Sequence, residues 1–470
     1  MTKVFVLGLD GAPPRMVFGE WKKHLPNISK MMKEGCYARM KSSIPPSTIV
    51  AWSSFCSGYD AGQLGVYSYT HQLKKNSNKR MFTNSTCVKK PLIWDELSKK
   101  GLKSNVLNIP LTFPAKKING IMITDFLTPS FESNSVYPLA FKKEMLKLFN
   151  GKKYMFDVGE FTAYKRMSTE KLLKKTYEMT EMHFKVMNHL IDNSKWDFFI
   201  TEIIGTDRLG HLFWHYFDKK HVRYEKNSKF KNSMLDYFIW VDKEIGKLRR
   251  KLPEDCVLII ASDHGIERMD GKININDWLI KEGYLVLKKD YAELAVLKPQ
   301  KLSLEGIDFT KTKAYSVGSY QGRIYINLKE RDKQGIVSKK DFNKIRKELE
   351  RKLKTIKGKT GRKLDTKVFW PEKIYSEYDW RCPDLTVYFD DLIYGSNDEV
   401  GNKSLYTLDT LVGKTVAGHS PEGVFIASGK GIKKKGNLGN VDILQMAPTI
   451  YGIMGLKQPK KVLKKPLNVF

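Results

Sequence analysis

Cysteine is scarce in this chain of 470 residues. The cysteines are odd in number, widely spaced and never arranged as CxxC; they are Cys36, Cys56, Cys87, Cys256 and Cys382. This pattern argues against a disulfide scaffold and is typical of reduced, mostly buried thiols. No signal-peptide pattern separates Met1 from the apolar segment VFVLGLD. We therefore expect a cytoplasmic protein.

Long apolar runs and acidic residues are also few. The longest apolar run, ILQMAPTIYGIMGL (443–456), contains a proline and is too short to span a membrane, so we expect a buried helix there. The 51 acidic residues face 82 Lys and Arg, which gives a net charge of +31. Such a charge attracts anions. Scattered lysines favour solvated faces over a specific nucleic-acid surface.

The last segment differs from this scatter. Residues 429–470 hold nine lysines and one aspartate. This lysine-rich tail leaves peripheral contact with a membrane surface open as an interpretation. The sequence does not indicate an oligomeric state.

Short apolar runs alternate with amphipathic stretches along most of the chain. Strands are predicted at 4–9, 104–110, 196–207, 256–263 and 423–429, and helices at 91–101, 168–193 and 235–252. This alternation predicts an α/β fold with a mostly parallel sheet covered on both faces. KKNSNKR (74–80) is predicted as a polar loop.

The pattern changes near Asn274. A hairpin-like stretch at 315–328, a helix at 338–353 that begins after Ser338, and a strand at 384–389 follow lysine-rich loops. We therefore predict two domains: a discontinuous core formed by 1–274 and 416–470, and an inserted smaller α+β domain at 275–415.

Three apolar runs end in aspartate, at Asp10, Asp207 and Asp263. Ligands of open α/β sheets bind at the carboxyl ends of the strands. A single aspartate there is usually a cap or a turn residue. Three carboxylates gathered in a partly dry cleft would repel one another unless cations neutralised them. The three aspartates therefore point to a metal site.

Histidines accompany these aspartates. His211 lies four residues after Asp207, which places both on one helix face, His264 directly follows Asp263, and His419 precedes the last core strand. Carboxylate with imidazole favours zinc or manganese over calcium, and the two clusters predict two ions. The other histidines are interpreted as packing or surface residues: His24, His71, His183, His189, His215 and His221. His215 continues the face of His211, so a substrate contact stays open for it.

The segment SIPPSTIVAWSSFCSG (43–58) offers hydroxyl groups where a helix begins. A hydroxyl of Thr48 or Ser47 at the positive end of that helix favours an alkoxide or a bound anion. A metal ion can activate such a hydroxyl without a separate general base. Because neither a GxSxG elbow nor a P-loop is present, we favour a metal-activated hydroxyl.

These residues resemble a known family. The matching segments, in order, are GLDGAPP (8–14), SSIPPSTIVAWSSFCSGYDAGQLGVYSY (42–69), TDRLGHLFWHYFD (206–218), ASDHG (261–265), GRIYINLKERDKQGIV (322–337), CPDLTVYFDD (382–391), GHSPEGVFIASG (418–429) and DILQMAPTIYGIMGL (442–456). The chain resembles the type I phosphodiesterase/nucleotide pyrophosphatase family of the alkaline phosphatase superfamily, in its prokaryotic form. The resemblance implies a three-layer αβα sandwich with an inserted smaller domain.

The resemblance also implies roles for single residues. Thr48 would be the nucleophile and would form a phospho-threonine intermediate, with Ser47 as the local alternative. Asp207, His211 and His419 would hold one metal. Asp10, Asp263 and His264 would hold the other, with Thr48 beside it. The implied cofactors are two divalent ions, zinc first and manganese second, and the implied partner is a small phosphodiester or nucleotide.

The sequence departs from the family in three places. Tyr69, in GVYSY, stands near where eukaryotic members have an asparagine that steadies a phosphate oxygen, which puts nucleotide preference in doubt. KKVLKKPL (460–467) replaces the usual Asp-Gly near the C-terminus. Cys56 is followed by SGYD, which argues against a sulfatase. Aromatic residues near the motifs are expected to pack, although a stacking role toward a base stays open; they are Trp52, Phe213 and Trp214.

Three functions remain open at this stage. The first is a two-metal phosphodiesterase or nucleotide pyrophosphatase. The second is a phosphatase or mutase-like phosphotransferase that uses the same ligands, with the inserted domain deciding between the two. The third is a non-catalytic basic protein that binds acidic headgroups or nucleic acid, whose binding would fall steeply with salt and need no metal.

Overall fold

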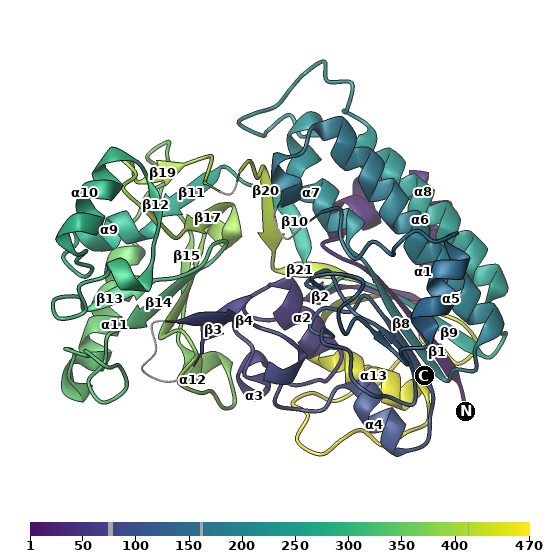
Figure 1. The fold of residues 1–470 in the computed structure, drawn as a ribbon. Helices are drawn as coiled ribbons and strands as arrows, with labels where there is room; N and C mark the ends of the chain where they lie inside the picture. The colour runs from purple at the N-terminus through teal and green to yellow at the C-terminus, as the bar shows by residue number, and fades with distance from the viewer. Residues whose placement is uncertain (74–78, 160–162, 412) are drawn as a thin grey trace.

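The computed structural model describes residues 1–73, 79–159, 163–411 and 413–470. Residues 74–78 of the predicted polar loop lie outside this part. The chain builds one large sheet and one smaller sheet, which lie side by side (Figure 1). An antiparallel ribbon, β10 (Gly265–Arg268) with β20 (Ala417–Ser420), lies between them.

The large sheet has nine strands, five of whose eight pairings are parallel. In spatial order they are β22 (Gly436–Asp442), β2 (Cys36–Lys41), β21 (Glu422–Ser428), β9 (Cys256–Ala261), β1 (Lys3–Leu9), β8 (Phe198–Ile203), β5 (Ser104–Leu107), β6 (Gly120–Ile123) and β7 (Val136–Tyr137). Almost every residue of the central β9, β1 and β8 is buried, because helices cover both faces. The predicted α/β class is confirmed.

Helices form a layer on each side of this sheet (Figure 1). One layer contains α1 (Pro26–Glu34), α5 (Phe141–Leu148), α6 (Thr169–Asn193), α7 (Gly205–Phe217) and α8 (Ser233–Lys251). The other contains α2 (Thr48–Phe55), α4 (Ile93–Lys99) and α13 (Met446–Ile453). The predicted buried helix in 443–456 is α13, which follows a capping box between Asp442 and Gln445. None of the described helices is long and apolar enough to cross a membrane.

The smaller sheet has its own hydrophobic core. Its strands are β13 (Ala314–Ser316), β14 (Gly322–Ile326), β16 (Leu385–Phe389), β17 (Tyr394–Asn397), β11 (Gly271–Asn274) and β19 (Tyr406–Thr407), with β15 (Thr366–Phe369) paired to β16. Around it lie α9 (Ile275–Lys281), α10 (Lys289–Leu297), α11 (Lys339–Leu353) and the short α12 (Pro371–Ile374). Its buried apolar residues run from Ile273 to Val400. The domain boundaries at 275 and 415 stay predictions.

Candidate metal centre

Asp10 and Asp263 lie side by side because their strands do. β1 and β9 are parallel neighbours with Gly8 opposite Ala261, so the residues that follow each strand share the carboxyl edge of the sheet. Both side chains are 0% exposed. Asp263 Oδ1 accepts a hydrogen bond from the Gly11 amide at 3.4 Å. The two carboxylates therefore lie together at this edge, and their role as metal ligands stays a prediction.

Asp207 reaches the same edge by another route. We predicted a strand at 196–207, but β8 ends at Ile203 and Asp207 lies in the first turn of α7. The predicted strand was too long because the residues after Ile203 are also buried, although they form the start of a helix. Helical spacing then brings His211 Nε2 to 3.2 Å from Asp207 Oδ1.

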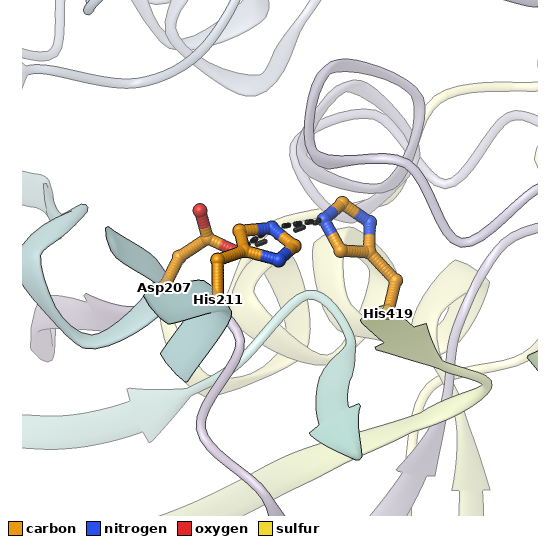
Figure 2. A group of neighbouring side chains, drawn as sticks. All are labelled: Asp207, His211 and His419. Carbon is orange, nitrogen blue, oxygen red and sulfur yellow. Dashed lines mark hydrogen bonds and ion pairs between the residues drawn. The ribbon is translucent and has the colours of Figure 1, made fainter. Parts of the chain in front are cut away.

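His419 completes this first group from the other end of the chain. It lies on β20, and its Nε2 is 3.6 Å from Asp207 Oδ1 and 3.2 Å from His211 Nε2. Figure 2 shows the aspartate and the two imidazoles turned toward one another. All three side chains are buried.

His264 forms a second group on the opposite side of His419. Its ring stacks on His419 with centroids 3.7 Å apart. Its Nε2 lies 3.2 Å from Asp263 Oδ2 and 3.7 Å from Asp10 Oδ1. Ligand atoms of Asp10, Asp207 and His264 can all meet within 4.8 Å, so Asp207 faces both groups. We had expected Asp207 to belong to the first group alone.

Backbone carbonyls fix the orientation of the three imidazoles. Nδ1 of His211 lies 2.7 Å from the Ala417 oxygen, Nδ1 of His419 lies 2.8 Å from the Pro46 oxygen, and Nδ1 of His264 lies 3.0 Å from the Gly265 oxygen. Since a carbonyl only accepts, each Nδ1 carries the proton. Each Nε2 therefore presents a lone pair to the carboxylates, as metal-binding histidines do.

Carboxylate oxygens in the centre lack hydrogen-bond partners. Asp10 Oδ1, Asp207 Oδ1 and Asp263 Oδ2 are buried and accept no hydrogen bond. Two imidazole lone pairs also face each other across 3.2 Å. Such an arrangement is costly unless cations lie among the atoms. The donor set therefore fits divalent ions that accept nitrogen and oxygen ligands, such as zinc or manganese.

The titration of these groups shows the same repulsion. Burial and the neighbouring Asp207 raise the pKa of Asp10 well above its usual range, and burial with Asp10 does the same to Asp263. Burial would also raise the pKa of Asp207, but His211, when it is protonated, and Arg208 lower it. Burial lowers the pKa of His264 to about 4, so its imidazole is neutral near pH 7.

Thr48 is the hydroxyl that faces this centre. It is the first residue of α2, with Ser47 as N-cap, and it is 2% exposed. Its Oγ1 lies 3.2 Å from His264 Nε2, and the Tyr69 hydroxyl hydrogen-bonds to it. The Ser47 side chain makes no capping hydrogen bond. The helix end therefore presents Thr48, and not Ser47, to the carboxylates.

Comparison with protein families agrees with this geometry. The family model described as "Type I phosphodiesterase / nucleotide pyrophosphatase" matches residues 4–419. The chain belongs to that family. The match covers the smaller sheet and all strands of the large sheet except β21 and β22, and it includes Asp10, Thr48 and His419. No curated protein sequence matches the chain significantly.

Solved structures share the fold of this family member at low identity. Human ectonucleotide pyrophosphatase/phosphodiesterase 5 is 14% identical, with a TM-score of 0.54 over 97% of this chain and 96% of that one. An inactive threonine-to-alanine variant of the murine protein, in complex with AMP, is 13% identical, with a TM-score of 0.55 over 98% and 96%. The similarity extends over both domains.

Three further residues of this phosphodiesterase-family centre were not recognised from the sequence. The Trp52 indole, which we expected to pack, is buried and donates to Asp10 Oδ2 at 2.9 Å. Arg208 donates to Asp207 Oδ2 at 2.8 Å. Tyr320, from the smaller domain, stacks on His419 with centroids 4.6 Å apart. The contacts of Trp52 and Tyr320 join segments that are distant in the sequence, so no local motif predicts them. Arg208 directly follows Asp207, but no sequence motif indicates that the two side chains bind each other.

The remaining candidates pack elsewhere. Phe213 and Trp214 are buried among aromatic neighbours, so neither offers a stacking face. His183 and His221 each bond a backbone carbonyl. His215 lies against Tyr216, and it is absent from the groups of described residues that could hold an ion.

A cavity of about 630 Å³ lies beside the centre. Aromatic and aliphatic side chains dominate its wall, among them Phe82, Leu111, Phe113, Phe126, Phe131 and Phe156. Asp157 also lines it and binds Arg208, which in turn binds Asp207. The volume is typical of a site for a small molecule. Asp157 therefore lies between the cavity and Arg208, and neither Arg208 nor a predicted ligand lines the cavity.

Proposed function

We propose that this family member hydrolyses phosphodiester or pyrophosphate bonds with Thr48 as nucleophile and two divalent ions as cofactors. The main support for this proposal is the position of Thr48 Oγ1. It lies at the positive end of α2, 3.2 Å from His264 Nε2, and beside carboxylates that have unsatisfied oxygens. A hydroxyl in this position is suited to attack on phosphorus.

We propose the division of ligands that the family resemblance implied, with Asp207 facing the second group as well. Asp207, His211 and His419 would hold one ion. Asp10, Asp263 and His264 would hold the other, with Thr48 beside it. The donor set favours zinc, with manganese second. When bound, the ions supply charge neutralisation and polarisation of the phosphoryl oxygens.

Thr48 carries the covalent step. Its oxygen forms a bond to phosphorus as the bond to the leaving oxygen breaks, and the leaving group departs with a proton. Water then cleaves the phospho-threonine and restores the hydroxyl. Tyr69 lies within hydrogen-bond reach of Thr48 and is placed to steady a phosphoryl oxygen, the task of the asparagine in eukaryotic members.

The substrate we propose is a small phosphodiester, with nucleotide-like compounds among the candidates. Support comes from the family name and from the AMP bound by the murine relative. The apolar cavity beside Arg208 has room for one ester group. The five free cysteines, four of them buried, agree with the cytoplasmic location that we propose.

The test compares a diester with a monoester. Protein loaded with zinc or manganese is expected to hydrolyse bis-p-nitrophenyl phosphate faster than p-nitrophenyl phosphate. Thr48→Ala should lower kcat by about a thousandfold or more, because it removes the nucleophile. Ser47→Ala is the matched control, since it deletes the adjacent hydroxyl, and its activity should stay within about threefold of wild type.

Each other outcome contradicts a part of the proposal. Faster monoester hydrolysis would indicate a phosphatase or a mutase-like enzyme. Loss of activity in Ser47→Ala with retention in Thr48→Ala would reassign the nucleophile. Absence of turnover with a panel of aryl and nucleotide esters, in either metal, would favour the non-catalytic reading.

A further inference from the structure

One buried arginine in the smaller domain has no carboxylate partner among the described residues. The described residues include three buried arginines: Arg208, Arg323 and Arg346. Arg208 binds Asp157 through two hydrogen bonds, and Arg346 binds Glu372 in the same way. Arg323 is 6% exposed and forms no ion pair with a described residue. Burying an unpaired cation costs free energy of folding, which suggests that Arg323 has a role other than stabilising the fold.

The surroundings of Arg323 add charge of the same sign. Arg323 lies on β14, and its Nε donates to the Val317 oxygen at 3.1 Å. Asp398, a carboxylate that acts on the pKa of Arg323, accepts a hydrogen bond from the Gly318 amide at 2.9 Å. Arg80 lies close enough to lower the pKa of Arg323 further, beyond the larger effect of burial.

Arg80 belongs to the core domain and reaches the same place. It begins β4 (Arg80–Phe82), which forms a hairpin with β3 (Thr70–Gln72). Figure 1 shows this hairpin extending from the core toward β14. Arg80 Nη2 donates to the Thr70 oxygen at 2.7 Å, and its side chain hydrogen-bonds to Tyr325. No described carboxylate forms an ion pair with Arg80 either.

Both arginines are held by segments that end at the candidate centre. Thr70, which binds Arg80, directly follows Tyr69, the neighbour of Thr48. Val317, which binds Arg323, begins the loop that carries Tyr320 onto His419. The alternation along β14 turns Ile324 into the smaller domain's core and Arg323 toward the core domain. The two cations therefore flank the centre from two domains.

We propose that Arg80 and Arg323 together bind a second phosphate group of the substrate, beyond the phosphorus that Thr48 attacks. Guanidinium groups bind phosphate oxygens through paired hydrogen bonds, and a phosphate between the two side chains would neutralise both. This rests on the proposed function and narrows its substrates to pyrophosphate-linked or multiply phosphorylated compounds. A diester with a single charge leaves this subsite empty.

A matched pair of substrates tests the proposal. Thymidine triphosphate and the p-nitrophenyl ester of thymidine monophosphate share the attacked phosphorus and the nucleoside, and differ in whether the leaving group is pyrophosphate. Arg323→Met and Arg80→Met are expected to lower the ratio of kcat/KM, triphosphate over aryl ester, at least tenfold. Arg39→Met is the control; it removes an exposed arginine that pairs with Glu422 on the sheet edge, and the ratio should stay within twofold.

A binding measurement separates this proposal from the proposed function. Calorimetry with inorganic pyrophosphate, on Thr48→Ala protein kept in EDTA, requires neither turnover nor metal. Arg323→Met should weaken that binding at least tenfold. Equal pyrophosphate affinity in both proteins would overturn the subsite even if diesters are hydrolysed. Loss of turnover in the wild type, with this affinity difference retained, would overturn only the proposed reaction.

Thermal stability separates a binding role from a structural one. If Arg323 serves a ligand, Arg323→Met removes an unpaired buried charge, so the Tm should stay equal or rise. A lower Tm, together with equal losses on both substrates, would show that Arg323 only supports the fold. Arg323→Lys keeps the charge without the fork, so its Tm should match that of wild type while its substrate ratio stays low.

Discussion

Asp157→Asn is expected to destabilise the core domain far more than Asp409→Asn, although both carboxylates bind arginine in the same way. Asp157 accepts from Arg208 at 2.9 and 2.8 Å. Asp409 accepts from Arg223 at 2.8 and 2.7 Å. The side chains of the first pair are 6% and 3% exposed, and those of the second are 26% and 56% exposed. The two pairs differ in burial, and Arg208 also binds Asp207.

Burial sets the magnitude. Removing one partner of a buried pair leaves an uncompensated charge and costs about 3–5 kcal/mol, whereas an exposed pair contributes about 0–1 kcal/mol. Asparagine keeps one acceptor oxygen and Asp207 still binds Arg208, so we expect the lower end, about 3 kcal/mol, for Asp157→Asn. At about 2 °C per kcal/mol, the midpoint of thermal unfolding should fall by about 6 °C.

The assay is thermal unfolding followed by tryptophan fluorescence in EDTA, so that metal binding does not contribute. Asp409→Asn should shift the midpoint by about 1 °C or less. Equal shifts in the two variants would refute the reasoning, because they would show that burial does not control the cost of losing the carboxylate.

Three further predictions concern pH, packing and metal. Burial lowers the pKa of His183 from 6.5 to about 4, so the unfolded state binds more protons between these values. The advantage of wild type over His183→Gln, which keeps a donor for the Met155 oxygen, should be constant above pH 6.5 and shrink by about 3 kcal/mol toward pH 4. A pH-independent difference in unfolding free energy would contradict this. A Cβ on Gly8 would overlap the Trp52 ring, so Gly8→Ala should displace the indole from Asp10 and lower the free energy of unfolding by about 1–3 kcal/mol. Denaturant unfolding measures this loss, and diesterase activity should fall with it. An unchanged unfolding midpoint would contradict the packing of Trp52 against Gly8. EDTA should lower the Tm, and zinc or manganese, but not calcium, should restore it; recovery with calcium would argue against imidazole ligands.

The parts of the centre that depend on local pattern could be predicted from the sequence. Asp10 and Asp263 follow strands whose apolar runs leave little choice of structure, and His264 is the next residue. His211 follows from helical spacing once Asp207 is chosen. The error at Asp207 has the same origin, because a buried helix start after β8 continues the apolar run of the strand.

The contacts between distant segments could not be predicted in this way. Trp52 and Asp10 are 42 residues apart, and Arg208 and Asp157 are 51 apart. Tyr320 reaches His419 only because the smaller domain is placed against the core. The local sequence does not determine which polar groups come into contact, because the packing of whole helices and strands brings them together.

The late position of His419 and β21 in the chain has a consequence for biosynthesis. β21 lies between β9 and β2, so these strands have no neighbour on that side until residues 422–428 are made. His419 is translated 155 residues after His264, which takes the ribosome about 8 to 30 s. During this interval the nascent core exposes two open strand edges beside a candidate metal centre that still lacks one imidazole. Open edges of this kind can pair with other chains, so the unfinished core is more prone to aggregation than the complete one.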